Sequence, residues 1–276
     1  MGRYLSIDET SLSNDELYTI VTNKAAKGRK GALVAMIKGT QTESIVEVLK
    51  QIPERLRNQV EEVTLDMAPS MNLAVERCFR KAHRVTDRFH VQRLACDAVQ
   101  ELRIKYRWEA LDDENDSIKS AREKGITFTP EVLENGDTKK QLLARSRYLL
   151  FKHKDKWTST QKVRARILFQ LYPKIKEAYS LSLRLGIIYR SCHTKEEAFK
   201  KLALWFNEVE SSTIQSFKTV VRTVQTHYLS ILNFFNNRNT NASAESFNAK
   251  IKSFRSSSRG VRDIPFFLFR LANIYA

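Results

Sequence analysis

The sequence predicts an α/β fold in which a mixed β-sheet is flanked by helices and interrupted by a large all-helical insertion. Strand-like and helical segments alternate through residues 3–104, whereas only helical periods are found from about residue 105 to 236. A basic helix and an apolar helix then follow. We therefore divide the chain into 1–104, the first part of the sheet domain, 105–236, the helical insertion, and 237–276, the C-terminal part of the sheet domain.

The first part of the sheet domain contains short β-branched or apolar runs bounded by Gly, Asn and Asp residues, which is typical of strands. The expected strands are 4–10, 17–22, 32–37, 63–66 and 84–86. A helix is expected at 42–50, because Ile45, Val46 and Leu49 share one helical face and Pro53 follows. Further helices are expected after residues 66 and 87. This order, β-β-β-α-β-α-β-α, is that of a ribonuclease H-like domain.

Helical periods dominate the insertion. Apolar residues recur at helical spacing in segments 142–150, 167–175 and 198–206. Residues 125–136 are expected to form a loop, because Gly125, Pro130 and Gly136 all disfavour a continuous helix.

Composition narrows the class of partner. The chain has 276 residues, and 47 Lys and Arg against 31 Asp and Glu give a net charge of +16. Such an excess favours a polyanionic partner, most often nucleic acid. The three cysteines form no CxxC pair, and no apolar run is long enough to span a bilayer. We expect a cytoplasmic protein with reduced cysteines and no membrane contact.

Three acidic residues stand at positions suited to metal binding. Asp8 and Asp66 end strand-like runs, and Glu245 opens the basic helix 242–252. The first and fourth strands of a ribonuclease H-like sheet are neighbours, about 4.8 Å apart. The three carboxylates could thus hold two divalent cations for phosphoryl transfer on nucleic acid. Taken singly, each Asp is better explained as a turn or cap residue, and Glu245 is equally compatible with a surface acid favoured by the helix dipole.

The basic helix is amphipathic. Phe247, Ile251 and Phe254 fall on the face expected to contact the core, and Glu245, Asn248, Ala249 and Lys252 fall on the other side. The final forty residues are strongly basic, and their location beside the proposed metal site favours phosphate binding. The candidate nucleic-acid contacts are Asn248, Lys250, Lys252, Arg255 and Arg259.

Asp87 and His90 are possible accessory residues. Both follow the expected strand 84–86. They could contact the scissile phosphate or a metal ion; alternatively, Asp87 caps the following helix and His90 packs beside the end of the sheet.

Several motifs resemble those of bacterial insertion-sequence transposases of the Asp-Asp-Glu class, and of the ISL-three group in particular. They are Ser6-Ile7-Asp8-Glu9, Leu65-Asp66-Met67, Asp87-Arg88-Phe89-His90-Val91 and Asn241-x3-Glu245-x2-Asn248-x-Lys250-Ile251-Lys252. The likeness covers nearly the whole chain, including the helical insertion. Ser246 stands where the group's Glu-Gly-x-Asn pattern has glycine, a sterically mild change in a helix.

The resemblance implies a ribonuclease H-like transposase that uses two Mg²⁺ ions, with Mn²⁺ as a substitute. Asp8, Asp66 and Glu245 then occupy the family's catalytic, metal-binding positions. The reaction implied is cleavage at the ends of the element followed by transfer of the 3′-hydroxyl end into target DNA. Because two DNA ends must be brought together, the reaction implies a homo-oligomer on DNA. The resemblance also implies a location in the bacterial cytoplasm, associated with the nucleoid.

One family feature is not visible in this sequence. Many relatives carry an N-terminal zinc-binding and helix-turn-helix region that recognises the element ends, whereas Met1 here leads directly into the first strand. We expect a separate polypeptide to supply that region. The alternative hypothesis is a truncated or domesticated transposase that acts only as a DNA-binding protein.

Overall fold

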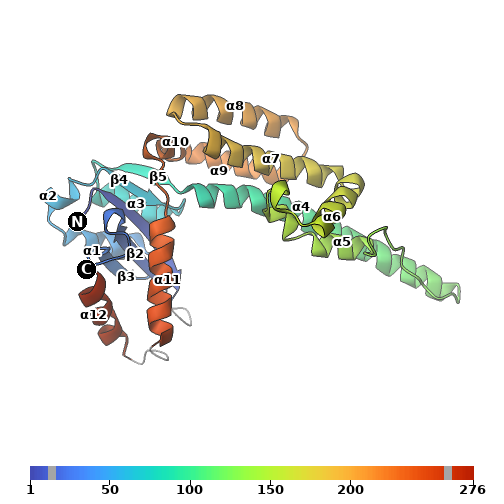
Figure 1. The fold of residues 1–276 in the computed structure, drawn as a ribbon, viewed down its shortest axis with the longest axis horizontal. Coiled ribbons are helices and arrows are strands. Elements are labelled where there is room, and N and C mark those ends of the chain that lie inside the picture. The colour runs from blue at the N-terminus through green and yellow to red at the C-terminus, as the bar shows by residue number, and fades with distance from the viewer. Residues whose placement is uncertain (12–16, 258–262) are drawn as a thin grey trace. The chain divides into compact units, whose positions relative to one another are not determined.

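The computed structural model describes residues 1–11, 17–257 and 263–276. The chain forms two compact units, one made of residues 1–90 and 227–276 and the other of residues 91–226 (Figure 1). The boundaries expected from the sequence, after residues 104 and 236, lie inside α4 (Arg88–Glu123) and α10 (Tyr228–Asn237).

The first unit is built on a five-stranded mixed sheet with the order β3-β2-β1-β4-β5. Its strands are β1 (Tyr4–Ser11), β2 (Leu17–Asn23), β3 (Leu33–Lys38), β4 (Glu62–Leu65) and β5 (His83–Thr86). The first three strands pair in antiparallel fashion, and β1, β4 and β5 are parallel. Parallel neighbours need crossover connections, and helices provide them. The predicted fold class, a ribonuclease H-like mixed sheet with flanking helices and a helical insertion, is confirmed.

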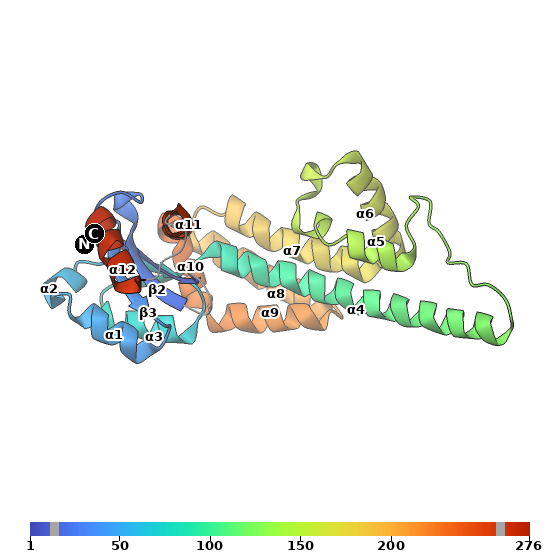
Figure 2. The same ribbon diagram turned by 90° about the horizontal axis from the view of Figure 1, so that it is seen from below.

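Helices cover both faces of this sheet (Figure 2). On one face, Leu5 and Ile7 of β1 pack with α1 (Thr42–Lys50) and α3 (Pro69–Cys78); the short α2 (Glu54–Arg57) leads into β4. On the other face, Tyr18 and Ile20 of β2 pack with α11 (Ala242–Ser257) and α12 (Ile264–Tyr275). Asp8 is the register partner of Ile20 and therefore lies on the α11 face, since paired residues share a side of the sheet.

All regular elements between residues 91 and 226 are helices, as predicted for the insertion. They are most of α4, then α5 (Lys139–Arg145), the short 3₁₀ helices η2 (Leu149–Phe151) and η3 (Lys154–Lys156), α6 (Ser159–Leu171), α7 (Pro173–Ser191), α8 (Lys195–Ser211) and α9 (Gln215–Thr226). The loop predicted at 125–136 lies between α4 and α5. Trp205 is fully buried in this unit, and its indole N–H donates to the carbonyl oxygen of Leu181 at 3.0 Å.

None of the helices in the described part of the chain is both long and apolar enough to cross a membrane.

Candidate functional site

Three aspartates lie on or directly after neighbouring strands. Asp8 lies within β1, which continues to Ser11, whereas Asp66 directly follows β4. The parallel pairing of β1 with β4 sets Ser6 opposite Thr64. Continuing this register by two residues brings Asp8 opposite Asp66, on strands about 4.8 Å apart. Asp87 comes directly after β5, the next strand. The two aspartates predicted to be neighbours thus lie side by side on or after the adjacent strands β1 and β4. A third aspartate, Asp87, follows the next strand.

Asp8 is half-buried and lies within the field of the other predicted acids. Its Oδ1 accepts a hydrogen bond from the Glu9 N–H at 2.9 Å, and its Oδ2 accepts one from Asn248 Nδ2 at 2.7 Å. Burial raises the pKa of Asp8, and the charges of Glu245 and Asp66 raise it further. The structure therefore brings all three acids into one electrostatic neighbourhood.

Asp66 also stabilises the turn that leads from β4 into α3. Its Oδ1 accepts a hydrogen bond from the Ala68 N–H at 2.8 Å, at the start of α3. The interpretation of Asp66 as a turn residue is thus correct, and this hydrogen bond occupies one of its two carboxylate oxygens. It does not exclude a second role for Asp66.

Glu245 lies in the first turn of α11, and its side chain is exposed. Its N–H donates to the carbonyl oxygen of Asn241 at 2.9 Å, so Asn241 begins the helix. The side chain of Asn241 is buried, and its Nδ2 donates to the carbonyl oxygen of Ile7, one residue before Asp8, at 3.4 Å. The start of α11 is therefore fixed to β1 next to Asp8.

The other half of α11 is held by Lys250. Its Nζ donates to the carbonyl oxygen of Gly28 at 3.1 Å. Gly28 has φ of +70°, and a Cβ there would stand 3.0 Å from Lys250 Nζ. Only glycine combines this backbone conformation with such a close approach at low cost.

Asp87 joins the starts of two helices. It is 1% exposed, and its Oδ1 accepts a hydrogen bond from the Asn241 N–H at 3.0 Å. Its Oδ2 accepts one from the Phe89 N–H at 3.1 Å, as expected if Asp87 caps α4. Burial alone would raise the pKa of Asp87, but the interactions with His90, Asn241 and Phe89 lower it below its usual value.

His90 places a potential cation beside the three acids. Its Nδ1 lies 3.3 Å from Asp87 Oδ2, an ion-pair distance, although the angles are not those of a hydrogen bond. Pairing with Asp87 raises the pKa of His90, and the charges of Asp66 and Asp8 raise it as well.

The candidate DNA contacts on α11 differ in their surroundings. The expectation that Asn248 faces away from the core is wrong, because Asn248 is only 6% exposed and its amide contacts Asp8. Lys252 is exposed and Arg255 is partly buried. Arg259 lies outside the described residues.

Two features near the site have only weak sequence signals. Glu9 is partly buried. Its pKa is raised by this burial and by the charges of Asp66 and Asp8. Lys24 Nζ contacts the Oγ1 of Thr64, two residues before Asp66, and lies 3.4 Å from Glu62 Oε1. In the sequence, the signal for this buried ion pair is Glu62, an acidic residue at the start of an apolar strand.

The donor chemistry of the three acids suits a hard divalent cation. Such ions prefer carboxylate oxygens. Burial is the main cause of the raised pKa of Asp8, and bound cations would relieve the smaller contribution from the charges of Glu245 and Asp66. The buried Oδ1 of Asn248 also has no hydrogen-bond partner within the described ranges. In the described part of the chain, no three His, Cys, Asp or Glu side chains are already close enough together to hold a metal ion. The residues thus fit such an ion in chemical type, but within the described ranges the carboxylates are not close enough together to coordinate one.

Comparison with known proteins identifies a family. The family model DDE_Tnp_ISL3, whose description is Transposase, matches residues 5–271. No curated protein matches the sequence. The family match spans both compact units and includes every described residue of the candidate site.

Proposed function

The chain belongs to the DDE_Tnp_ISL3 family of transposases, and we propose that it cleaves DNA at the ends of an insertion sequence and joins the freed 3′ end to target DNA. The observation that carries this proposal is the strand register that sets Asp8 opposite Asp66, together with the effect of Glu245 on the pKa of Asp8. In this proposal the three acids, from distant parts of the chain, form one site, as two-metal chemistry requires.

In this proposal Asp8, Asp66 and Glu245 hold two Mg²⁺ ions, with Mn²⁺ as a substitute. When bound, the ions would activate the attacking water or 3′-hydroxyl and stabilise the leaving oxygen. Asn248 orients the Asp8 carboxylate through its 2.7 Å hydrogen bond. Asp87 and Asn241 keep the first turn of α11, and with it Glu245, beside β1.

DNA is the proposed partner, and the exposed basic residues at the end of the chain are proposed to contact its phosphates. Lys252 is the clearest of them, because its side chain is exposed on the same helix as Glu245. Two DNA ends must be brought together, so we also propose that the chain acts as a homo-oligomer on DNA. A separate end-binding protein is a further proposed partner.

The test is metal-dependent cleavage and joining of a labelled oligonucleotide that carries an element end. Wild type is compared with Asp66→Asn and Glu245→Gln, which keep side-chain shape but weaken metal binding. We expect both variants to lose more than about 100-fold in rate while DNA affinity persists. Glu76→Gln, which removes an exposed acid of α3 paired with Arg84, is the matched control and should keep full activity.

Each outcome of this assay has a distinct meaning. Cleavage that survives both substitutions would contradict the proposed site. A wild-type chain that binds the DNA end but never cuts it, even with the end-binding protein present, would favour a domesticated transposase that only binds DNA.

A further inference from the structure

A strongly basic segment lies in the helical unit, outside the candidate active site. Residues 139–166 contain ten Lys and Arg but only one acid, Asp155. Five of these cations pair with acids that precede the segment: Lys139 with Glu131, Lys140 with Glu114, Arg145 and Arg164 with Asp137, and Arg166 with Glu134. The pairing is therefore confined to the two ends of the segment.

The middle of the segment keeps its positive charge. Within the described ranges, no carboxylate pairs with Arg147, Lys152, Lys154, Lys156 or Lys162. Asp155, the one acid among them, lies 3.0 Å from His153 Nδ1. Four unneutralised cations thus stand within ten residues.

Two aromatic side chains are exposed among these cations. Tyr148 is 67% exposed and Phe151 is 44% exposed, whereas Leu149 and Leu150 between them are buried. The Arg147 guanidinium lies 5.5 Å from the centre of the Tyr148 ring. Cationic side chains interleaved with exposed aromatic rings are typical of surfaces that bind unpaired nucleic-acid bases.

Hydrogen bonds from neighbouring side chains fix the backbone of this surface. The carbonyl oxygens of residues 147, 149 and 152 accept hydrogen bonds from Gln100 Nε2 at 3.1 Å, Trp157 Nε1 at 2.8 Å and the Tyr179 hydroxyl at 2.7 Å. The Trp157 and Tyr179 rings stack with their centres 5.5 Å apart. Because the backbone is already fixed, binding a ligand here costs little backbone conformational entropy, and the loss is confined to the side chains.

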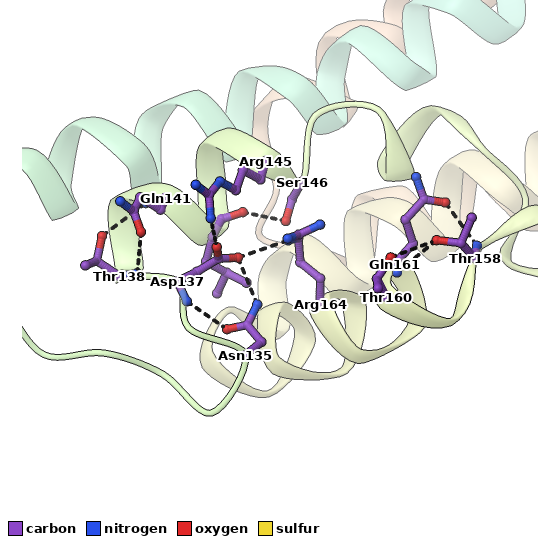
Figure 3. Close-up of polar contacts among 11 residues, drawn as sticks. Asn135, Asp137, Thr138, Gln141, Arg145, Ser146, Thr158, Thr160, Gln161 and Arg164 are labelled. Carbon is purple, nitrogen blue, oxygen red and sulfur yellow. Dashed lines mark hydrogen bonds and ion pairs between the residues drawn. The ribbon is translucent and has the colours of Figure 1, made fainter.

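Polar contacts also fix the two helices that flank the surface (Figure 3). Asp137 accepts hydrogen bonds from Arg145 of α5 and from Arg164 of α6. Reciprocal side-chain caps, Thr138 with Gln141 and Thr158 with Gln161, begin α5 and α6. The helices on either side of residues 147–156, α5 and α6, are therefore held in defined positions.

We propose that the 147–156 surface binds DNA whose bases are unpaired. Lys152, Lys154 and Lys156 contact the phosphates, and a base stacks on Tyr148. An aromatic ring can stack only on a base whose face is accessible, so the surface favours single-stranded over duplex DNA. The choice of DNA as the nucleic acid rests on the proposed function, whereas the location rests on the charges and exposed rings described above.

The test is binding of a fluorescent single strand of about 20 nucleotides, and of its duplex, to the full-length chain in EDTA over a range of salt concentrations. The triple variant K152Q/K154Q/K156Q should bind both DNAs more weakly, and its salt slope on the single strand should fall by about two. Three exposed lysines elsewhere in the unit provide the matched control, K124Q/K174Q/K200Q, which changes the charge equally and should keep the wild-type slope.

The aromatic contact has its own variants. Tyr148→Ala should weaken single-strand binding by about 5- to 100-fold with an unchanged salt slope, and Tyr148→Phe should restore it. Duplex affinity should hardly change. Circular dichroism confirms that each variant keeps its helical content.

Failure of this inference is distinguishable from failure of the proposed function, because binding is measured in EDTA without catalysis. Equal slopes for the two triple variants, no single-strand binding by wild type, or an equal loss on duplex in Tyr148→Ala would each overturn the inference. Tighter binding of an RNA strand of the same sequence would overturn the choice of DNA. Binding as described here without any cleavage would contradict only the proposed function.

Discussion

At the scale of single residues, hydrogen bonds to Asp8 oppose the effect of its partial burial on its pKa. Burial and the nearby acids raise the pKa of Asp8, and the backbone N–H of Glu9 opposes that rise. The Asn248 amide donates to the other carboxylate oxygen. A hydrogen bond to the charged form favours ionisation, so Asn248 supports the form of Asp8 that the proposed metal site requires.

Replacing Asn248 by Ala should therefore raise the pKa of Asp8 further and slow the reaction by about 10-fold on the acid limb of the pH–rate profile, with a smaller effect near neutral pH. Because metal binding needs the ionised carboxylate, the rising limb of the pH–rate profile should shift to higher pH. Ser246→Ala, an exposed substitution on the same helix, is the control. A slower variant with an unchanged pH profile would contradict this role of Asn248.

The sequence revealed the acids of the site more readily than the residues that support them. Asp8 and Asp66 stand where hydrophobic runs end, and period-two alternation settles the face on which Asp8 lies. Asn248 was misplaced because it follows Phe247 by about 100° around the helix, at the margin of the buried stripe. Its side of that margin depends on the tilt of α11 over the sheet, which one sequence does not encode locally.

At the scale of elements, Asp87 links the start of α4 to the start of α11. One carboxylate oxygen accepts a hydrogen bond from the N–H of Phe89, two residues after Asp87. The other accepts one from the N–H of Asn241, 154 residues after Asp87. The hydroxyls of Thr86 and Ser230 lie 2.7 Å apart and connect β5 to α10 in the same way. These contacts join the two points at which the chain leaves the sheet unit and returns to it.

Asp87→Ala should leave the Asn241 N–H buried without an acceptor and destabilise the sheet unit by about 2–4 kcal/mol. It should also speed hydrogen exchange at the start of α11, including the Glu245 amide. Asp87→Asn keeps one acceptor oxygen and should recover part of both effects. Asp97→Ala, an exposed acid of α4, serves as the control; slow exchange of the Glu245 amide in Asp87→Ala would contradict the link.

Asp137 has a comparable place in the helical unit (Figure 3). Burial would raise its pKa, but hydrogen bonds from Arg164 and Arg145 lower it below the usual value. A carboxyl whose pKa is lower in the folded state stabilises the fold above its unfolded pKa of about 3.9. That contribution is lost as the pH falls through the folded value.

Asp137→Asn should therefore lower the free energy of unfolding by about 2 kcal/mol at pH 7, because two arginines lose their carboxylate. The difference from wild type should shrink as the pH falls below about 4. Urea unfolding at pH 7 and pH 3 measures both values. Asp155→Asn, an exposed acid of the same unit, is the control, and a difference that stays constant with pH would contradict the assignment.

Element prediction from the sequence succeeded where an apolar face is clear. The helix expected at 42–50 is α1 (Thr42–Lys50), with Ile45 and Leu49 buried. The full length of α4 was not foreseen, because its second half is mostly exposed and includes the acidic run Asp112-Asp113-Glu114. Helical periodicity is readable only where one face is buried.

At the scale of the whole molecule, the candidate site depends on contacts between residues far apart in the sequence. Asp8 and Asn248 are 240 positions apart, yet their side chains share a hydrogen bond. The order of elements and the family motifs predicted that the two ends of the chain meet. The boundaries of the helical insertion were harder to predict, because α4 and α10 continue across the expected positions without a break.

The measurement that tests the central claim most directly is cleavage of the protein itself by hydroxyl radicals generated at bound Fe²⁺, an ion that can replace Mg²⁺ at oxygen-ligand sites. We predict cuts in the chain near Asp66 and near Glu245, suppressed by excess Mg²⁺ and absent in Asp8→Asn. Cuts elsewhere in the chain, or the same cuts in Asp8→Asn, would contradict a metal site shared by these three acids.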